Sequence, residues 1–272
     1  MISLALDNSK LAKTYDEISD SQYESGKKLL AELKVKPGET VLDIGCGTGR
    51  LGLYLLDIIG PTGRFIGIDP LPERISIAND NNVHPNAEFR TGVAEDLSFL
   101  GNNSVDLVYL SAVFHWVPDK QKALQEISRV LKPGGRIGLT TNAKELVKAT
   151  TLRSVTTEVL SRVPYRGQVD AEAFAPTRHG VTATQLVELF LDAGFRVADV
   201  RVLAIERLYH TGRDIVDFAE ASTFGNYLNH VPADLRDKAR FDLESAFEIL
   251  RGDEGIPFQL YTLFAIAEKI GA

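Results

Sequence analysis

The chain has 272 residues, of which 44% are hydrophobic and 25% are charged, and its formal net charge is −7. This composition is ordinary for a globular protein, and the negative charge argues against a broad nucleic-acid-binding surface. The single cysteine, Cys46, excludes an intrachain disulfide, and no apolar run approaches the ~20 residues of a membrane span. Because residues 1–13 lack the basic and apolar regions of a signal peptide, we expect a cytoplasmic protein.

The predicted elements alternate between helices and strands along most of the chain. Residues 9–34 are expected to form two helices, which begin near Ser9 and Ser21. Hydrophobic patterning predicts strands at 40–44, 63–69, 87–91, 106–110, 136–140, 195–207 and 258–267. Helices are predicted after the first strand and at 72–81, 121–131 and 182–193. Residues 212–251 are expected to be mostly helical, with a break near His230–Pro232.

This alternation predicts an α/β fold with a doubly wound, mostly parallel seven-stranded sheet. We expect a single domain that covers residues 1–272. Its core is predicted to comprise residues 35–142, 181–207 and 257–270. The remaining segments, residues 1–34, 143–180 and 208–256, are predicted to form a helical lid over the carboxyl ends of the strands.

The strongest motif is Val41–Arg50 (VLDIGCGTGR), in which an apolar strand leads into three glycines and a helix-compatible segment. Glycines let the backbone approach a ligand closely, and the start of a helix offers free N–H groups to it. The G-x-G-x-G spacing, with Arg50 in place of a third glycine, departs from the G-x-G-x-x-G dinucleotide fingerprint. Asp43 would repel a pyrophosphate and would suit a ligand that carries an ammonium and a sulfonium. The alternative is a glycine turn in some other α/β domain.

This segment resembles motif I of the class I S-adenosylmethionine-dependent methyltransferases. The resemblance implies a Rossmann-like fold and binding of S-adenosylmethionine, with S-adenosylhomocysteine as the product. It places these residues of the first turn at the cofactor: Asp43, Gly45, Cys46, Gly47 and Gly49. Asp69, at the end of the second predicted strand, is expected to bind the ribose hydroxyls, and Leu71 is also placed at the cofactor. An exposed turn aspartate before a proline is the alternative for Asp69.

Two weaker signals extend this resemblance. Gly92–Leu97 (GVAEDL) is similar to the segment that recognises the adenine in this family, which implies Ala94 and Glu95 as cofactor-binding residues. Val93 stands where the family often has an aspartate, so the adenine contact falls to its neighbours. Tyr15 resembles the tyrosine found near the methionine end of the cofactor, although a core tyrosine is nearly as consistent with the pattern.

Asp106–Trp116 (DLVYLSAVFHW) carries the candidate catalytic group. The end of a parallel strand lies at the ligand crevice of such a sheet, so Ser111 is expected at the cofactor. The segment resembles the "H-W" version of the family's motif after strand four, found in enzymes that methylate small molecules. His115 is therefore a candidate general base, since imidazole accepts protons near neutral pH. A histidine that only shapes the pocket wall is the alternative.

These motifs predict a methyltransferase that acts on an oxygen or nitrogen of a small molecule, without a metal ion. We expect no nucleic-acid or membrane partner, and the oligomeric state stays open. The lack of an Asn-Pro-Pro-aromatic motif after strand four disfavours nucleobase and glutamine amides as acceptors, and the lack of an acid there disfavours the metal-assisted catechol type. A single cysteine argues against the multi-cysteine arsenite enzymes.

Three alternatives to this function remain. Phe114–Asp119 (FHWVPD) is similar to the same stretch of carboxyl methyltransferases of the trans-aconitate type. A carboxylate acceptor would need a cationic clamp, for which the candidates are Arg153, Arg166 and Arg178. A protein that binds the cofactor without transferring methyl would present the same pocket. A nicotinamide oxidoreductase is the third alternative, and the glycine spacing together with Asp43 argues against it.

Overall fold

The computed structural model describes residues 8, 10–12, 14, 20–169 and 179–271, so the predicted helix start at Ser9 lies outside it. The chain divides into two compact units. Unit 1 comprises Met1–Ile18, Ala143–Arg178 and Leu203–Thr262, and unit 2 comprises Ser19–Asn142, His179–Val202 and Leu263–Ala272. Among the described residues, no helix is long and apolar enough to cross a membrane.

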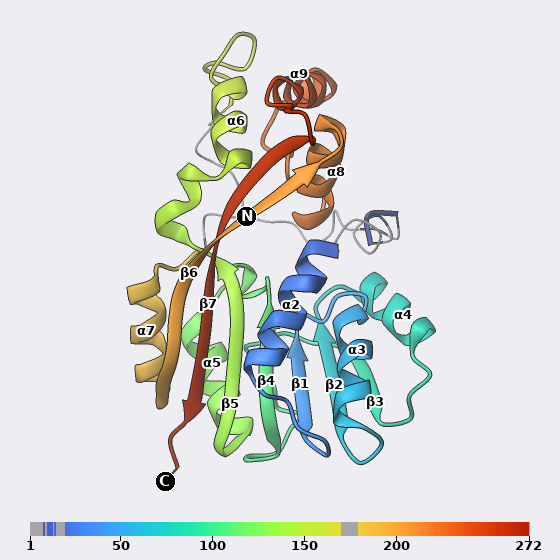
Figure 1. Ribbon diagram of the computed structural model, residues 1–272, viewed down its shortest axis with the longest axis vertical. Helices are drawn as coiled ribbons and strands as arrows, with labels where there is room; N and C mark the ends of the chain where they lie inside the picture. Colours follow the sequence, from blue (N-terminus) through green and yellow to red (C-terminus); the bar gives the residue numbers. More distant parts are fainter. Residues whose placement is uncertain (1–7, 9, 13, 15–19, 170–178, 272) are drawn as a thin grey trace. The chain divides into compact units, whose positions relative to one another are not determined.

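A seven-stranded sheet forms the centre of unit 2, in the order β3-β2-β1-β4-β5-β7-β6 (Figure 1). Its strands are β1 Thr40–Ile44, β2 Arg64–Asp69, β3 Ala87–Thr91, β4 Val105–Ser111, β5 Leu131–Asn142, β6 Phe195–Tyr209 and β7 Ile256–Lys269. All seven predicted strands are therefore confirmed, and the last three are longer than predicted.

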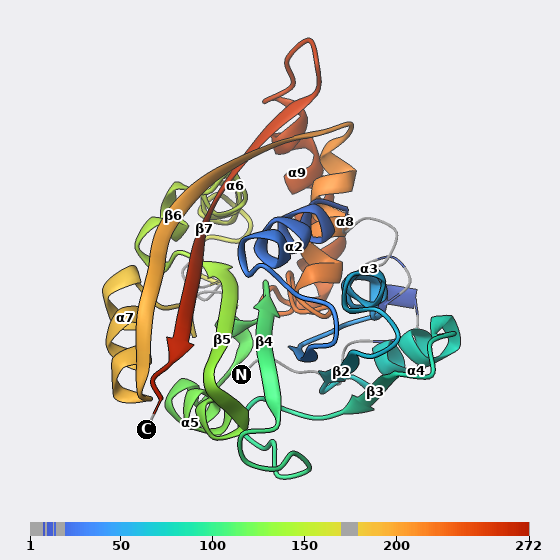
Figure 2. The ribbon, with the colours of Figure 1, turned by 60° about the horizontal axis from the view of Figure 1, so that its bottom comes forward.

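The strands of this sheet do not all run the same way. β1 pairs in parallel with β2 and β4, and the pairs β2–β3 and β4–β5 are also parallel. The arrow of β7 points opposite to that of β1, and Figure 2 shows β7 between β5 and β6. The sheet is thus mixed, and the prediction of a mostly parallel sheet is wrong. The chain leaves β6 and re-enters the sheet at the same end, so β7 runs in the opposite direction. The prediction missed this because the apolar pattern of a strand does not reveal its direction.

Helices α3 Arg50–Ile59, α4 Pro72–Asn81, α5 Lys120–Val130 and α7 Ala183–Asp192 connect or precede the strands, and α2 Asp20–Glu32 precedes β1. α2 contacts α3 and β5, whereas α5 contacts α7 and β5. Figure 1 shows α2 and α3 in front of the sheet and α5 behind it, as expected for a doubly wound sheet. α3 buries Leu55, Leu56 and Ile59 at helical spacing, and all three join the core cluster that also contains Val41 and Phe65.

The entry into β5 is irregular. The ladder between β4 and β5 pairs Val105 with Leu131, and the next pair joins Leu107 to Arg136. The extra residues of β5 loop out at Gly134, whose φ is +74°. The predicted strand at 136–140 is therefore the regular part of a longer strand that begins with a bulge.

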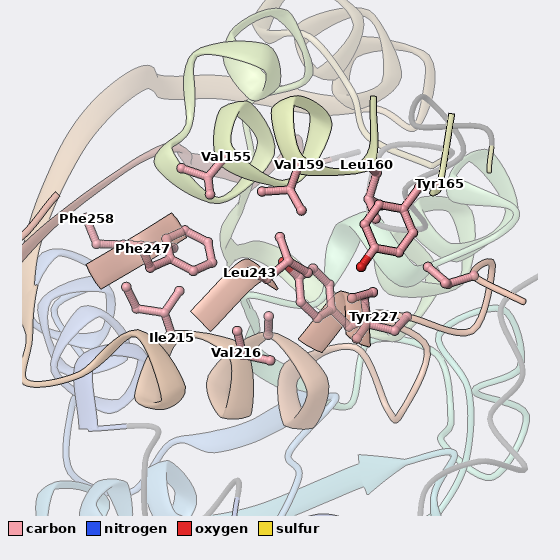
Figure 3. Close-up of a cluster of buried hydrophobic side chains, with 14 of the residues drawn as sticks. Val155, Val159, Leu160, Tyr165, Ile215, Val216, Tyr227, Leu243, Phe247 and Phe258 are labelled. Carbon is pink, nitrogen blue, oxygen red and sulfur yellow. The ribbon is translucent and has the colours of Figure 1, made fainter. Parts of the chain in front are cut away.

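Unit 1 is built around helices α6 Thr151–Leu160, α8 Gly212–Ser222 and α9 Arg236–Glu248. α9 contacts both α6 and α8, and side chains of all three helices form one buried apolar cluster (Figure 3). The predicted break near His230–Pro232 is confirmed, because that segment separates α8 from α9. The role of these helices as a lid stays a prediction.

Candidate functional site

The glycine loop lies between β1 and α3, where the sequence placed it. The N–H groups of Gly45 and Cys46 both donate to the carbonyl of Ile68, at 2.7 and 3.0 Å. Gly47 has a φ of +56°, and a Cβ built on it would meet no heavy atom within 4 Å. The same Cβ on Gly45 would lie 2.3 Å from Val113. Gly45 is therefore required by packing, whereas Gly47 leaves an open space beside the backbone.

Asp69 fastens this loop to the end of β2. Its Oδ2 accepts from the N–H of Gly47 at 3.0 Å, and its Oδ1 accepts from the N–H of Leu71 at 2.9 Å. Asp69 is only 6% exposed and Leu71 is 5% exposed. Asp69 thus holds the backbone on both sides of the turn, at Gly47 and at Leu71.

Asp43 is a buried carboxyl in the middle of the sheet. The hydroxyl of Tyr109, its register partner on β4, donates to Asp43 Oδ2 at 2.7 Å. Burial raises the pKa of Asp43 to about 8; the Tyr109 hydrogen bond opposes this rise and the charge of Asp69 adds to it. Asp43 is therefore mostly protonated at neutral pH. Burial likewise raises the pKa of the Cys46 thiol, which keeps that thiol neutral and unreactive.

The segment after β3 is held by hydrogen bonds to the next helix. Ala94 is 4% exposed, and Glu95 is half-buried, with its Oε1 accepting from the N–H of Asp119 at 3.2 Å. Asp119 caps α5 by accepting from the N–H of Lys122. These bonds fix the position of Gly92–Leu97 after the carboxyl end of β3.

The segment after β4 turns sharply into a short 3₁₀ helix, η2 Phe114–Trp116. Ser111 ends β4, and the next residue, Ala112, has a φ of +58°. The N–H of Ala112 donates to both the hydroxyl and the carbonyl oxygen of Thr140. His115 is 6% exposed, and its Nδ1 lies 3.1 Å from Thr141 Oγ1. Burial lowers the pKa of His115 to about 3, and the nearby charge of Lys120 adds to the effect. His115 is thus a neutral imidazole at physiological pH.

The predicted site residues of unit 2 all lie in or directly after β1, β2, β3 and β4. Tyr15, the remaining predicted residue, lies outside the described residues. Sequence reasoning missed Tyr109 and Thr141, the partners of Asp43 and His115. The register between β1 and β4 is the signal that would have found Tyr109, because it sets that residue directly opposite Asp43.

Comparison with known proteins agrees with this arrangement. Residues 42–139 match the family model described as "Methyltransferase domain". This segment is therefore similar to a methyltransferase domain. The matched segment begins in β1 and ends in β5, so it contains the glycine loop, Asp69 and His115. The mixed seven-stranded sheet with its flanking helices is a Rossmann-like fold.

Two curated methyltransferases are similar to this chain in sequence. An arsenite methyltransferase of Halobacterium salinarum is 31% identical over 170 residues, which cover 60% of this chain and 39% of that protein. A demethylmenaquinone methyltransferase of Lactobacillus johnsonii is 33% identical over 139 residues, which cover 48% of this chain and 57% of that protein. The aligned part of the chain thus spans about half the length of these relatives.

A solved structure extends the likeness of fold to almost the whole chain. It comes from a complex between the Haloferax volcanii Trm112 methyltransferase activator and a methyltransferase. The alignment has a TM-score of 0.61 and 23% identity, and it covers 96% of this chain and 95% of the other. At this identity the match establishes the fold alone.

Proposed function

We propose that this chain is an S-adenosylmethionine-dependent methyltransferase that methylates an oxygen or nitrogen of a small molecule without a metal ion. The observation that carries the proposal is the open side of Gly47, since the backbone there is positioned for close approach by a ligand. The names of the two curated relatives, which act on arsenite and demethylmenaquinone, support a small-molecule acceptor. Cys46 is the only cysteine and is buried, so an arsenite-type thiol set is not part of the proposal.

The donor set around the loop fits the proposed cofactor. Asp69 would accept hydrogen bonds from the ribose hydroxyls while it continues to hold Gly47. Ala94, Glu95 and Ser111 would line the adenine and methionine sides, as the family resemblance implies. When bound, the cofactor supplies a methyl group already activated by a sulfonium. The protein then has to align the acceptor atom and exclude water from it.

Asp43 would complete the electrostatic fit. Its carboxyl is protonated near neutral pH when no ligand is bound, because burial raises its pKa to about 8. A cationic ligand beside the loop favours the ionised carboxylate, so its binding would lower this pKa and release a proton. Asp43, once ionised beside such a ligand, and Asp69 therefore suit a cofactor with positive charge.

For His115 the geometry favours the positioning role over the general base. A base is most effective when its pKa lies near the working pH, whereas the pKa of His115 is lowered to about 3. Its Nδ1 is engaged with Thr141, which fixes the ring in one orientation. We therefore propose that neutral His115 orients the acceptor and forms part of the pocket wall, and that the acceptor arrives already deprotonated or with a free lone pair.

The test is release of S-adenosylhomocysteine from S-adenosylmethionine in the presence of small acids, phenols and amines. We expect one acceptor class to stimulate release, and mass spectrometry of the product to show one added methyl group. A base-labile methyl ester would identify the carboxyl methyltransferase alternative. Tight cofactor binding without turnover on every class would contradict methyl transfer and favour a protein that only binds the cofactor.

A further inference from the structure

A groove lies between helices α8 and α9 of unit 1. The two helices contact each other, and the start of α8 lies against the end of α9, where the N–H of Gly212 donates to Glu248 Oε1 at 2.7 Å. The groove has a volume of about 410 Å³ and is lined by Arg213, Asp217, Asp237, Arg240, Phe241 and Glu244. All six residues belong to unit 1, so the groove does not depend on where the other unit lies.

An exposed phenylalanine lines this groove. Phe241 is 68% exposed, and it is the only phenylalanine with an exposed side chain among the residues that the structure describes. A ring that stays in water forgoes the free energy of its burial, and aromatic residues are enriched in the cores of protein–protein interfaces. An exposed ring beside a cavity of the same surface thus offers both an anchor and a receptor to a protein partner.

The charges in the middle of the groove neutralise one another. Arg240 forms an ion pair with Asp217 on α8, and a second one with Glu244 on its own helix at 3.0 Å. Glu244 is therefore satisfied by Arg240, and its distance of 3.8 Å to Arg213 is the longer of its two ion pairs. The middle of the groove thus needs no charge from a partner.

The two ends of the groove carry opposite charges. Arg213 lies at the Glu244 end, and its side chain is mostly exposed. Asp237 is exposed, and its side chain forms no ion pair with the described residues. On α9, Asp237 lies one turn before Phe241, about 6 Å along the helix, and Glu244 lies about 4.5 Å after it. The groove therefore has a cation at one end, an acid at the other and Phe241 between them.

We propose that this groove binds the same groove of a second copy of the chain, related to it by a two-fold axis near Phe241. Such an axis exchanges the two ends of the groove, so Arg213 of each copy would lie opposite Asp237 of the other. Phe241 of each copy would enter the other groove and pack against the guanidinium of Arg240. An arrangement without this exchange of ends would place Arg213 against Arg213, which like charges disfavour.

The first experiment measures dimerisation by sedimentation equilibrium over a series of protein concentrations. It compares the wild-type protein with Phe241→Ser and with the matched control Leu191→Ser, since Leu191 is 57% exposed on α7 and lies outside the groove. We expect a wild-type dimer that dissociates on dilution, at least tenfold weaker dimerisation of Phe241→Ser, and no change in Leu191→Ser. Equal dissociation constants for the wild type and Phe241→Ser would overturn the proposal. A wild type that stays monomeric would also overturn it and leave the groove to a different protein.

The second experiment exchanges the charges at the two ends. Arg213→Glu would set an acid against Asp237 of the second copy, and Asp237→Arg would set an arginine against Arg213. Each variant alone should therefore dimerise at least tenfold more weakly than the wild type. Thermal unfolding of each variant checks that it is folded, as expected for substitutions of exposed side chains.

Mixing the two charge variants is the decisive step. In a heterodimer of Arg213→Glu with Asp237→Arg, one contact pairs the new acid with the new arginine, and the other contact is the original pair. The equimolar mixture should therefore associate about as tightly as the wild type, although neither variant does so alone. A mixture that associates no more tightly than the separate variants would overturn the proposal.

Discussion

Replacing Gly47 with alanine separates strain in the backbone from loss of the ligand site. The φ of Gly47 is +56°, and the added Cβ would have no neighbour within 4 Å. The substitution should therefore lower the free energy of unfolding only by the conformational cost of a left-handed alanine, ~1–2 kcal/mol. Gly45→Ala should cost more, ~2–5 kcal/mol in total, because its Cβ would also lie 2.3 Å from Val113.

Gly194 provides the matched control for this prediction. Its φ is +80°, its Cβ would also have no neighbour within 4 Å, and it follows α7, outside the glycine loop. Gly194→Ala and Gly47→Ala should thus lose similar unfolding free energy in urea titrations. Only Gly47→Ala should lose affinity for S-adenosylhomocysteine in calorimetry, by about tenfold or more, which corresponds to ~1.4 kcal/mol. Equal affinities of the two variants would refute the view that a ligand occupies the open side of Gly47.

Three further predictions concern the side chains of the site. Asp69→Ala should sharply weaken S-adenosylhomocysteine binding, and unchanged affinity would refute its ribose role. The substitution should also lower the free energy of unfolding by ~1–3 kcal/mol for each N–H left without an acceptor. The pKa of Asp43 is raised from 3.8 to about 8, so between these pH values the folded state holds a proton that the unfolded state has lost. The wild type should therefore lose stability as the pH rises through this range, whereas Asp43→Asn should not. The difference between their unfolding free energies, wild type minus variant, should fall by at least ~2 kcal/mol from about pH 4 to about pH 8. A flat difference would mean that Asp43 is ionised in the fold. His115→Gln should lower turnover without removing an ionisation from the pH profile between pH 5 and pH 9, because His115 stays neutral throughout that range. Loss of an ionisation from the profile would restore the general base.

Much of the fold could be predicted because its signals are local. The alternation of apolar runs with turn residues located all seven strands, and the glycine loop marked where α3 begins. The direction of β7 could not be predicted, since the apolar composition of residues 258–267 is compatible with both a parallel and an antiparallel strand. The bulge at Gly134 was also hidden, because it depends on how β5 pairs with β4.

In the candidate site, too, the local features could be predicted and the long-range contacts could not. Asp43, Gly47 and Asp69 could be predicted as site residues because each lies in a short motif that can be recognised along the chain. Their partners depend on neighbours distant in sequence: Tyr109 lies 66 residues from Asp43, and Thr141 lies 26 residues from His115. The neutral state of His115 could not be read from residue type either, because it arises from burial by the folded chain.

The most direct test of the central claim is calorimetric titration of the wild-type protein with S-adenosylmethionine, S-adenosylhomocysteine and NADH. We predict dissociation constants on the order of micromolar for the first two ligands and no binding of NADH. Repeating the titration at neutral pH in buffers of different ionisation enthalpy should reveal release of a proton, which Asp43→Asn should abolish. Binding of NADH, or a folded protein that binds neither S-adenosyl compound, would contradict the account.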